Sequence, residues 1–238
     1  MYLIFVRHGD PIYNPDSITE KGKLQAQALS HRMARLGLDK IYSSTSNRAI
    51  MTAEPTAKLL GKEIELLDFA NEKYASADFG VDSDGKWVWC FFDKNIYDKF
   101  STEEVANMGF GWYESELFKD RDFGKGINRV RTETVRLIES FGYEYDYQKR
   151  SYKSINHKYN RVALFAHGGF GMAFLSCLLE IPYPVFCTRF TQLNCTGVCV
   201  IEIADEGDKI IPKLYQYAND SHLYKEELPL DFNGREIY

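Results

Sequence analysis

The first 69 residues alternate short apolar runs with longer amphipathic stretches, and this alternation limits the folds open to the chain. Three apolar runs are too short for helices and are typical of buried strands: Leu3–Val6, Lys40–Ser44 and Ile64–Phe69. A helix capped by Thr19 is expected to run to about Leu36, and a second, capped by Thr45 or Ser46, to end before Gly61. This β-α-β-α-β order predicts a sheet of parallel strands joined by crossover helices.

The pattern changes after Glu72, where the chain becomes rich in aromatic residues. We interpret residues 73 to about 125 as an insertion that caps one end of the sheet, within a single domain of residues 1–238. The aromatics suit either of two roles: flat surfaces for a substrate ring or acyl chain, or a core for the cap itself. Of these two roles we favour the core.

Regular elements are expected again after the insertion. In order, they are a helix (Ile127–Phe141), a polar connection (Tyr143–Asn160), a strand (Arg161–Phe165) and a buried helix (Phe170–Leu179). Two further strands, Gly197–Ile203 and Ile210–Tyr217, are expected to form a hairpin at the sheet edge. The predicted fold class is therefore α/β, a three-layer α/β/α sandwich with a mostly parallel central sheet.

Composition narrows the environment and the partners of the chain. A formal net charge of −5 and a pI near 5.6 argue against general affinity for nucleic acid or anionic membranes. The opening apolar run is interrupted by Arg7, too early for a signal peptide or a membrane-spanning helix. The five cysteines show no C-x-x-C spacing, which favours free buried thiols in a reduced cytosol, so we expect a cytoplasmic protein.

Two of the expected strands end in the same way, with an apolar run followed by histidine and then glycine. His8 and Gly9 follow the first strand, and His167 and Gly168 follow the fourth. Ligands of open α/β sheets lie beyond the carboxyl ends of parallel strands, so two central strands would bring the histidines together there. The glycines permit a sharp turn, and the free N–H groups that start the next helix favour an anion.

Two arginines are expected at the same edge of the sheet. Arg7 directly precedes His8, and Arg48 falls in the first turn of the helix after the second strand. A guanidinium combines a permanent charge with a planar fork of donors, so these residues suit phosphate. A metal held by the histidines is disfavoured, because the arginines would repel a cation and no third ligand has suitable spacing.

This set of side chains suggests covalent phosphoryl transfer. A neutral imidazole that attacks phosphorus forms a phosphohistidine and divides a difficult hydrolysis into two easier steps. The guanidiniums stabilise charge on the equatorial oxygens in the transition state. An alkoxide leaving group still needs a proton, and Asp68 and Glu72, near the end of the third strand, are the candidate acids.

Four segments resemble the histidine phosphatase superfamily, in its phosphoglycerate mutase-like branch. They are R-H-G-D-P-I-Y-N at 7–14, S-I-T-E-K-G-K-L-Q-A at 17–26, Y-S-S-T-S-N-R-A-I-M-T-A at 42–53 and V-A-L-F-A-H-G-G at 162–169. The resemblance covers nearly the whole chain, and the ordered set is far more specific than R-H-G alone.

The resemblance implies a role for individual residues. The phosphorylated nucleophile would be His8, the rest of the phosphate pocket Arg7, Arg48 and His167, with a phosphoryl contact from Asn14 and a backbone N–H from Gly168. Glu72 fits the place of the proton donor best, and Asp68 is its rival. No metal or organic cofactor is expected.

The implied activity is that of a metal-independent phosphomonoesterase of the histidine acid phosphatase type, acting on a small phosphorylated metabolite. Pro11 stands where the family often has Ser or Thr, which we interpret as a subgroup mark. The short segment between Asn14 and Thr19 favours a phosphatase over a glycolytic mutase. A phosphoglycerate mutase-type phosphomutase and a catalytically idle phospho-ligand binding module are the alternatives, and no oligomeric state is predicted.

Overall fold

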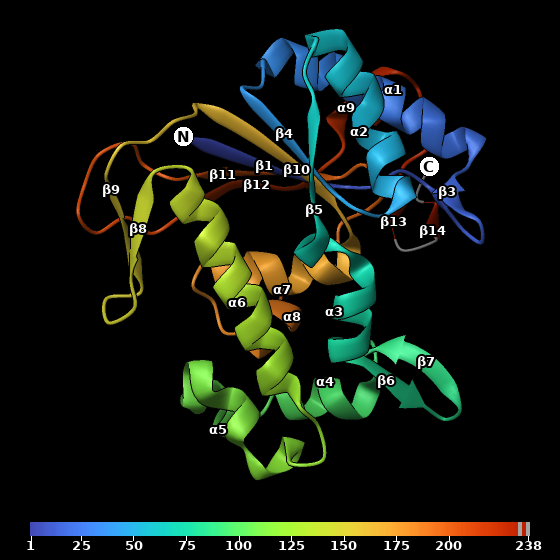
Figure 1. Ribbon diagram of the computed structural model, residues 1–238. Coiled ribbons are helices and arrows are strands. Elements are labelled where there is room, and N and C mark those ends of the chain that lie inside the picture. Colours follow the sequence, from blue (N-terminus) through green and yellow to red (C-terminus); the bar gives the residue numbers. More distant parts are fainter. Residues whose placement is uncertain (233–234, 237–238) are drawn as a thin grey trace.

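A six-stranded sheet forms the centre of the computed structural model, which describes residues 1–232 and 235–236 (Figure 1). In spatial order its strands are β12 (Lys213–Asn219), β11 (Val198–Glu202), β1 (Tyr2–Arg7), β10 (Arg161–Ala166), β4 (Lys40–Ser44) and β5 (Ile64–Leu67). The strands β1, β10, β4 and β5 are mutually parallel, while β11 runs antiparallel to β1 and to the edge strand β12. The predicted mostly parallel sheet with an edge hairpin is confirmed.

Helices cover both faces of this sheet, as the alternation of buried residues along β1 requires. Ile4 and Val6 pack with α1 (Glu20–Leu36) and α2 (Asn47–Leu60). Leu3 and Phe5 lie in the larger core with α6 (Phe123–Ser140) and α7 (Gly168–Leu178). Figure 1 shows α1 and α2 on one side of the strands and α6 and α7 on the other, so the predicted three layers are present.

The first two helices begin and end where the sequence predicts. The Thr19 hydroxyl accepts a hydrogen bond from the N–H of Gly22 and begins α1. The second helix begins after Ser46, but the Ser46 side chain makes no capping hydrogen bond, so that part of the prediction is wrong. The helix continues through Pro55 and ends at Gly61, whose φ of 61° is left-handed.

Residues 73–125, here called the aromatic segment, lie below the sheet in Figure 1. They comprise most of α3 (Glu72–Phe79), then β6 (Gly80–Ser83), β7 (Lys86–Trp89), α4 (Lys94–Phe100), α5 (Glu103–Met108), two 3₁₀ helices (Gly109–Glu114 and Glu116–Phe118) and the start of α6. Trp112 is 1% exposed and contacts the rings of Phe100 and Phe118, so much of the segment packs as a core. Its status as an inserted cap within one domain stays a prediction.

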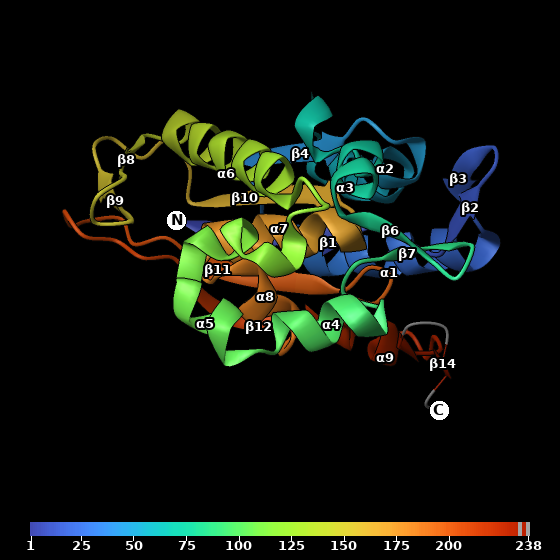
Figure 2. The same ribbon diagram turned by 90° about the horizontal axis from the view of Figure 1, so that it is seen from below.

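Three small hairpins, a 3₁₀ helix (Asp68–Ala70) and four short elements complete the described chain. The hairpins are β2–β3 (Pro11–Tyr13 and Asp16–Ile18), β6–β7 and β8–β9 (Tyr143–Asp146 and Ser151–Ser154); the short elements are α8 (Tyr183–Cys187), α9 (Ser221–Lys225), β13 (Asp231–Phe232) and β14 (Arg235–Glu236). The β8–β9 hairpin lies in the segment that was expected to be a polar connection. Its strands pair Tyr145 with Tyr152, and both of these side chains are buried. Figures 1 and 2 place β2–β3 and β6–β7 at the same end of the molecule, opposite β8–β9.

Two findings bear on the expectations drawn from composition. All five cysteines are free, and four of them are buried. Among the residues that the structure describes, no helix has the length and apolar character needed to cross a membrane.

Candidate active site

The carboxyl ends of β1 and β10 bring the two strand-end histidines together. The strands are parallel neighbours with Arg7 opposite Ala166, so the residues that follow, His8 and His167, leave the sheet side by side. Their ring centroids lie 5.2 Å apart, with an angle of 60° between the ring planes. The two imidazoles therefore meet at the edge where α/β sheets bind ligands.

The His8 ring is held in one orientation by its own loop. Its Nδ1 lies 2.7 Å from the carbonyl oxygen of Gly9, and because a carbonyl only accepts, Nδ1 carries the proton. The Nε2 atom of the neutral ring is then left with a free lone pair. Burial of a ring only 3% exposed, together with the charge of Arg7, lowers the pKa of His8 well below its usual value.

His167 is fixed by a serine that the sequence analysis did not single out. Ser44, the last residue of β4, places its hydroxyl 2.7 Å from Nε2 of His167. The same hydroxyl oxygen accepts the N–H of Ser46. When the hydroxyl donates its own proton to Nε2, the ring proton of His167 lies on Nδ1. Nδ1 is buried and has no hydrogen-bond partner among the described residues. Burial, followed by the effect of His8, lowers the pKa of His167 well below its usual value.

The two arginines lie beside the histidines, and each guanidinium is oriented by a hydrogen bond to another residue. Arg7 donates to the carbonyl oxygen of Leu193, and Arg48 Nη1 lies 2.6 Å from Asp16 Oδ1. The Nε atoms of both guanidiniums are buried without a partner in the described chain. Unpaired donors of two permanent cations, next to the unpaired Nδ1 of His167, are a site for an anion with several acceptor oxygens.

Asp16 holds the arginine from the β2–β3 hairpin. Its second carboxylate oxygen, Oδ2, accepts the N–H of Asn47 at 2.7 Å, at the N-terminus of α2. Asp16 thus neutralises part of the charge of Arg48 and caps the helix on which Arg48 sits. No motif pointed to Asp16, since the contact depends on how the hairpin folds back onto α2.

Glu72, the first residue of α3, places its carboxylate at the N-terminus of α7. Its Oε1 accepts the N–H of Gly169 at 3.0 Å and its Oε2 that of Phe170 at 3.1 Å. These N–H groups were expected to be free for a substrate anion, and the structure gives them to Glu72 instead. Burial raises the pKa of Glu72 above its usual value, against the opposing effect of the two backbone N–H groups.

Asp68, the rival acid, has a different environment. Its carboxylate accepts the Tyr74 hydroxyl at 2.6 Å and the Thr45 hydroxyl at 3.3 Å, and its side chain is 60% exposed. The hydrogen bond from Tyr74, followed by the charge of Lys73, lowers its pKa. An exposed carboxyl with a lowered pKa is a poor proton donor near neutral pH.

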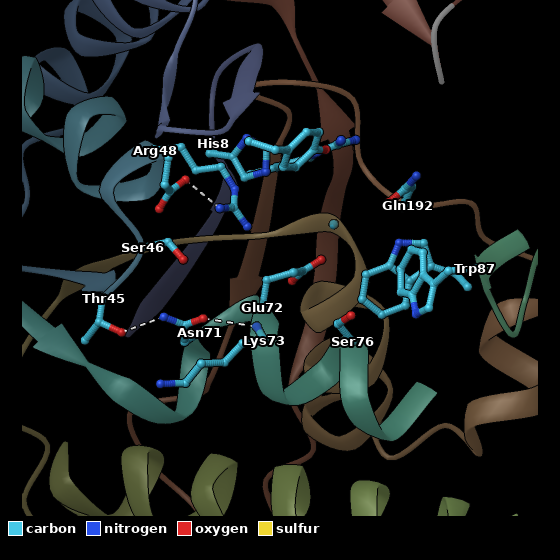
Figure 3. Close-up of a pocket in the computed structure, with 15 residues that line it drawn as sticks. His8, Thr45, Ser46, Arg48, Asn71, Glu72, Lys73, Ser76, Trp87 and Gln192 are labelled. Carbon is cyan, nitrogen blue, oxygen red and sulfur yellow. Dashed lines mark hydrogen bonds and ion pairs between the residues drawn. The ribbon is translucent and has the colours of Figure 1, made fainter. Parts of the chain in front are cut away.

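A cavity of about 540 Å³ opens over these groups (Figure 3). It is lined by Arg7, His8, Tyr13, Asp16, Thr45, Ser46, Arg48, Asn71, Glu72, Lys73, Ser76, Trp87, Trp89, Gly168 and Gln192. His167 is fully buried, with its ring centroid 5.2 Å from that of His8, and neither His167 nor Asp68 is in the lining. Asn14 is exposed at the β2–β3 turn and is likewise not in the lining. Five predicted site residues therefore share the cavity wall, and a sixth, His167, adjoins His8.

Gly9 shows why the loop after β1 needs glycine. Its N–H donates to the Thr52 hydroxyl at 2.9 Å, and a Cβ added there would lie 2.8 Å from the carbonyl oxygen of Gly22. Any larger residue would push the loop away from α1 and move His8 with it.

The chemistry open to this arrangement follows from its charges. A neutral imidazole with a free lone pair faces a cavity that holds two guanidiniums and a carboxyl with a raised pKa. Such a site binds a tetrahedral oxyanion and offers it a nucleophile and a proton. In the part of the chain that the structure describes, no group of three or more His, Cys, Asp or Glu side chains is placed to hold a metal ion.

Comparisons with known proteins bear on the family and on the fold. Residues 3–78 match the family model described as the histidine phosphatase superfamily (branch 1), which confirms the resemblance found in the sequence motifs. A search of curated proteins gives no match.

Solved structures share the fold over nearly the whole chain. A phosphoserine phosphatase from Entamoeba histolytica, in complex with 3-phosphoglyceric acid, is 22% identical with a TM-score of 0.59, over 93% of this chain and 98% of that one. A mycobacterial glucosyl-3-phosphoglycerate phosphatase, in complex with inorganic phosphate, is 17% identical with a TM-score of 0.60, over 93% and 98%. At these identities the likeness establishes the α/β fold.

Proposed function

We propose that this chain, whose residues 3–78 carry the histidine phosphatase pattern, is a phosphomonoesterase that hydrolyses a small phosphorylated metabolite. The observation that carries the proposal is the His8 ring, protonated on Nδ1 by its bond to Gly9, with Nε2 free beside His167. The phosphatases among the structural neighbours support the same reading.

In the first step, the lone pair of His8 Nε2 attacks phosphorus. The Nε2–P bond forms as the ester P–O bond breaks, and Glu72 gives its proton to the departing alkoxide oxygen. Arg7, Arg48 and the Nδ1–H of His167 stabilise the charge on the equatorial oxygens. Glu72 is assigned this role over Asp68 because it lines the cavity and has a raised pKa.

In the second step, water releases the phosphoryl group. Glu72, now a carboxylate, takes a proton from the water as its oxygen bonds to phosphorus and the Nε2–P bond breaks. The products are the alcohol from the first step and inorganic phosphate, and both His8 and Glu72 return to their starting protonation states. No step uses a metal ion, and we extend the proposal to metal independence.

The test is a screen of phosphorylated metabolites with protein dialysed against a chelator, measuring release of inorganic phosphate. His8→Ala should lower kcat/KM by about four orders of magnitude or more, because the nucleophile is lost. His31→Ala, at an exposed helix position, is the matched histidine control and should keep full activity.

Trapping completes the test. Rapid acid-free quenching should capture an acid-labile phosphoryl group on the wild-type chain and none on His8→Ala. A chain that binds phospho-ligands without turnover would be a binding module. One that needs a bisphosphate primer and moves the phosphoryl group between positions of the substrate, without releasing phosphate, would be a mutase; either outcome overturns the proposal.

A further inference from the structure

The cavity holds more than a phosphoryl group. Its volume of about 540 Å³ is in the range of sites that enclose a whole small-molecule ligand. Figure 3 shows Arg48 on one side of it, Glu72 in the middle and Trp87 on the other side. The part of the cavity beyond Glu72 is therefore the space for the leaving group, and the Trp87 and Trp89 indoles are among the residues that line the cavity.

Two glycines make room for these two indoles. A Cβ at Gly169, in the first turn of α7, would lie 2.2 Å from Cη2 of Trp89. A Cβ at Gly80, in β6, would lie 2.2 Å from Nε1 of Trp87. Each indole thus rests directly on backbone, at a place where any other residue would displace it.

The indoles differ in what covers them. Trp89 is partly buried and stacks on Phe91, with ring centroids 5.8 Å apart and planes 6° from parallel. Trp87 meets Trp89 at an angle of 72° and remains 54% exposed. Trp89 is therefore a fixed support, and Trp87 presents uncovered indole surface to the cavity.

The other groups near this wall suit a polar ring better than a second anion. Ser76 and Gln192 line the cavity and offer hydroxyl and amide groups to ring heteroatoms. Lys73, the remaining cation of the lining, lies 3.8 Å from Asp68 and 4.6 Å from the centre of the Tyr74 ring. Its charge is already balanced by Asp68, so it is a weak anchor for a substrate carboxylate.

We propose that the substrate is a phosphomonoester whose leaving group carries a flat aromatic or heteroaromatic ring, stacked on Trp87. This inference rests on the proposed function for the position of the phosphoryl group. Stacking on an indole suits any planar ring, so the class includes nucleoside monophosphates and aryl phosphates.

The first test measures kcat/KM for adenosine 5′-monophosphate, phenyl phosphate and glycerol 3-phosphate in three variants. Trp87→Ala should lower kcat/KM for the two ring substrates about tenfold further than for glycerol 3-phosphate. Trp87→Phe should restore most of that difference, because it restores a ring. Phe92 is an exposed aromatic residue of the same segment outside the cavity lining, so Phe92→Ala is the matched control. It should leave the ratio of kcat/KM for the ring substrates to that for glycerol 3-phosphate unchanged.

The second test separates this inference from the proposed function. Equilibrium binding of the same three compounds is measured to His8→Ala, which cannot be phosphorylated, and to the double variant with Trp87→Ala. The ring compounds should bind His8→Ala about tenfold more tightly than glycerol 3-phosphate, and the advantage should vanish in the double variant. Equal affinities would overturn the ring inference alone, whereas absence of turnover by the wild-type chain would overturn the hydrolase proposal alone.

Discussion

The strand-end site and the aromatic segment are built in opposite ways. His8 and His167 are placed by the backbone, since each follows a strand of one parallel pair and the register of that pair brings them together. Trp87 and Trp112 are placed by side-chain packing, one against Gly80 and the other among Phe100, Phe118 and Phe123. The first arrangement can be deduced from residue order, and the second only from three-dimensional contacts.

The difference also separates chemistry from recognition. The groups proposed to make and break bonds lie on strands and helix starts of the sheet, which are rigid. The surface proposed to bind the leaving group comes from a two-stranded hairpin, β6–β7, that packs on α7 through Trp89. Changes in the sheet should therefore abolish turnover for every substrate, while changes in the hairpin should alter the choice of substrate.

Among the substitutions that test this division between chemistry and recognition, the largest loss of activity is expected at Glu72, which lies between the two regions (Figure 3). Glu72→Gln should lower kcat/KM for an alkyl phosphate about 10²- to 10³-fold, because the leaving oxygen loses its proton donor. The loss should be much smaller for p-nitrophenyl phosphate, whose leaving group departs without a proton. Asp68→Asn is the matched control, and an equal or larger loss there would reverse the assignment of the acid.

The pH profile offers a second readout of the same change. His8 must be neutral to attack, and its lowered pKa keeps it neutral far into the acid range, so the acid limb lies well below pH 6.5. Glu72 must be protonated to donate, and its raised pKa moves the alkaline limb upward from the usual range of a glutamate. The plot of kcat/KM against pH should therefore be bell-shaped, with its maximum in mildly acidic to neutral conditions. Glu72→Gln should remove the alkaline limb, and a profile that keeps it would contradict the scheme.

A stability measurement sharpens the division within the aromatic segment itself. Trp112→Ala should lower the free energy of unfolding by about 3–5 kcal/mol, because it opens a cavity among packed rings. Trp87→Ala should cost less than about 1 kcal/mol, since that indole is 54% exposed. Urea unfolding followed by circular dichroism checks both values. Similar losses would show that the hairpin is as much a part of the core as Trp112.

The smallest effect is expected at Ser44, which acts on catalysis through His167. Ser44→Ala removes one hydrogen bond to Nε2 and should lower kcat about three- to tenfold. Ser44→Thr should recover most of the loss, because it returns the hydroxyl. Nitrogen NMR of the His167 ring should show the proton on Nδ1 in the wild-type chain and a mixture of tautomers in Ser44→Ala. An unchanged tautomer would leave Ser44 a purely structural role.

The helices that flank the strand-end site could be predicted from the sequence, because the residues that begin and end a helix act locally. The cap at Thr19 and the stop at Gly61 act within one turn of their helices, and both appear as expected. Arg48 falls in the first turn of α2, so its position near the sheet edge followed from helix geometry alone.

Other features depended on contacts between distant parts of the chain. Asp16 binds Arg48 from 32 residues away, and Ser44 binds His167 from 123 residues away. Glu72 takes the N–H groups that start α7, which the sequence left free for a substrate. The expectation that the aromatics form a core fits Trp112, while Trp87 is exposed in the cavity wall.

The sequence by itself determined the α/β order, the mostly parallel sheet and the meeting of His8 with His167, because hydrophobic periodicity and strand direction are encoded residue by residue. Only the tertiary structure decided which carboxyl enters the cavity, which donors stay unpaired and which indole faces the ligand space. Those outcomes depend on burial and on pairing between residues far apart in the chain, and both exist only once the elements have packed.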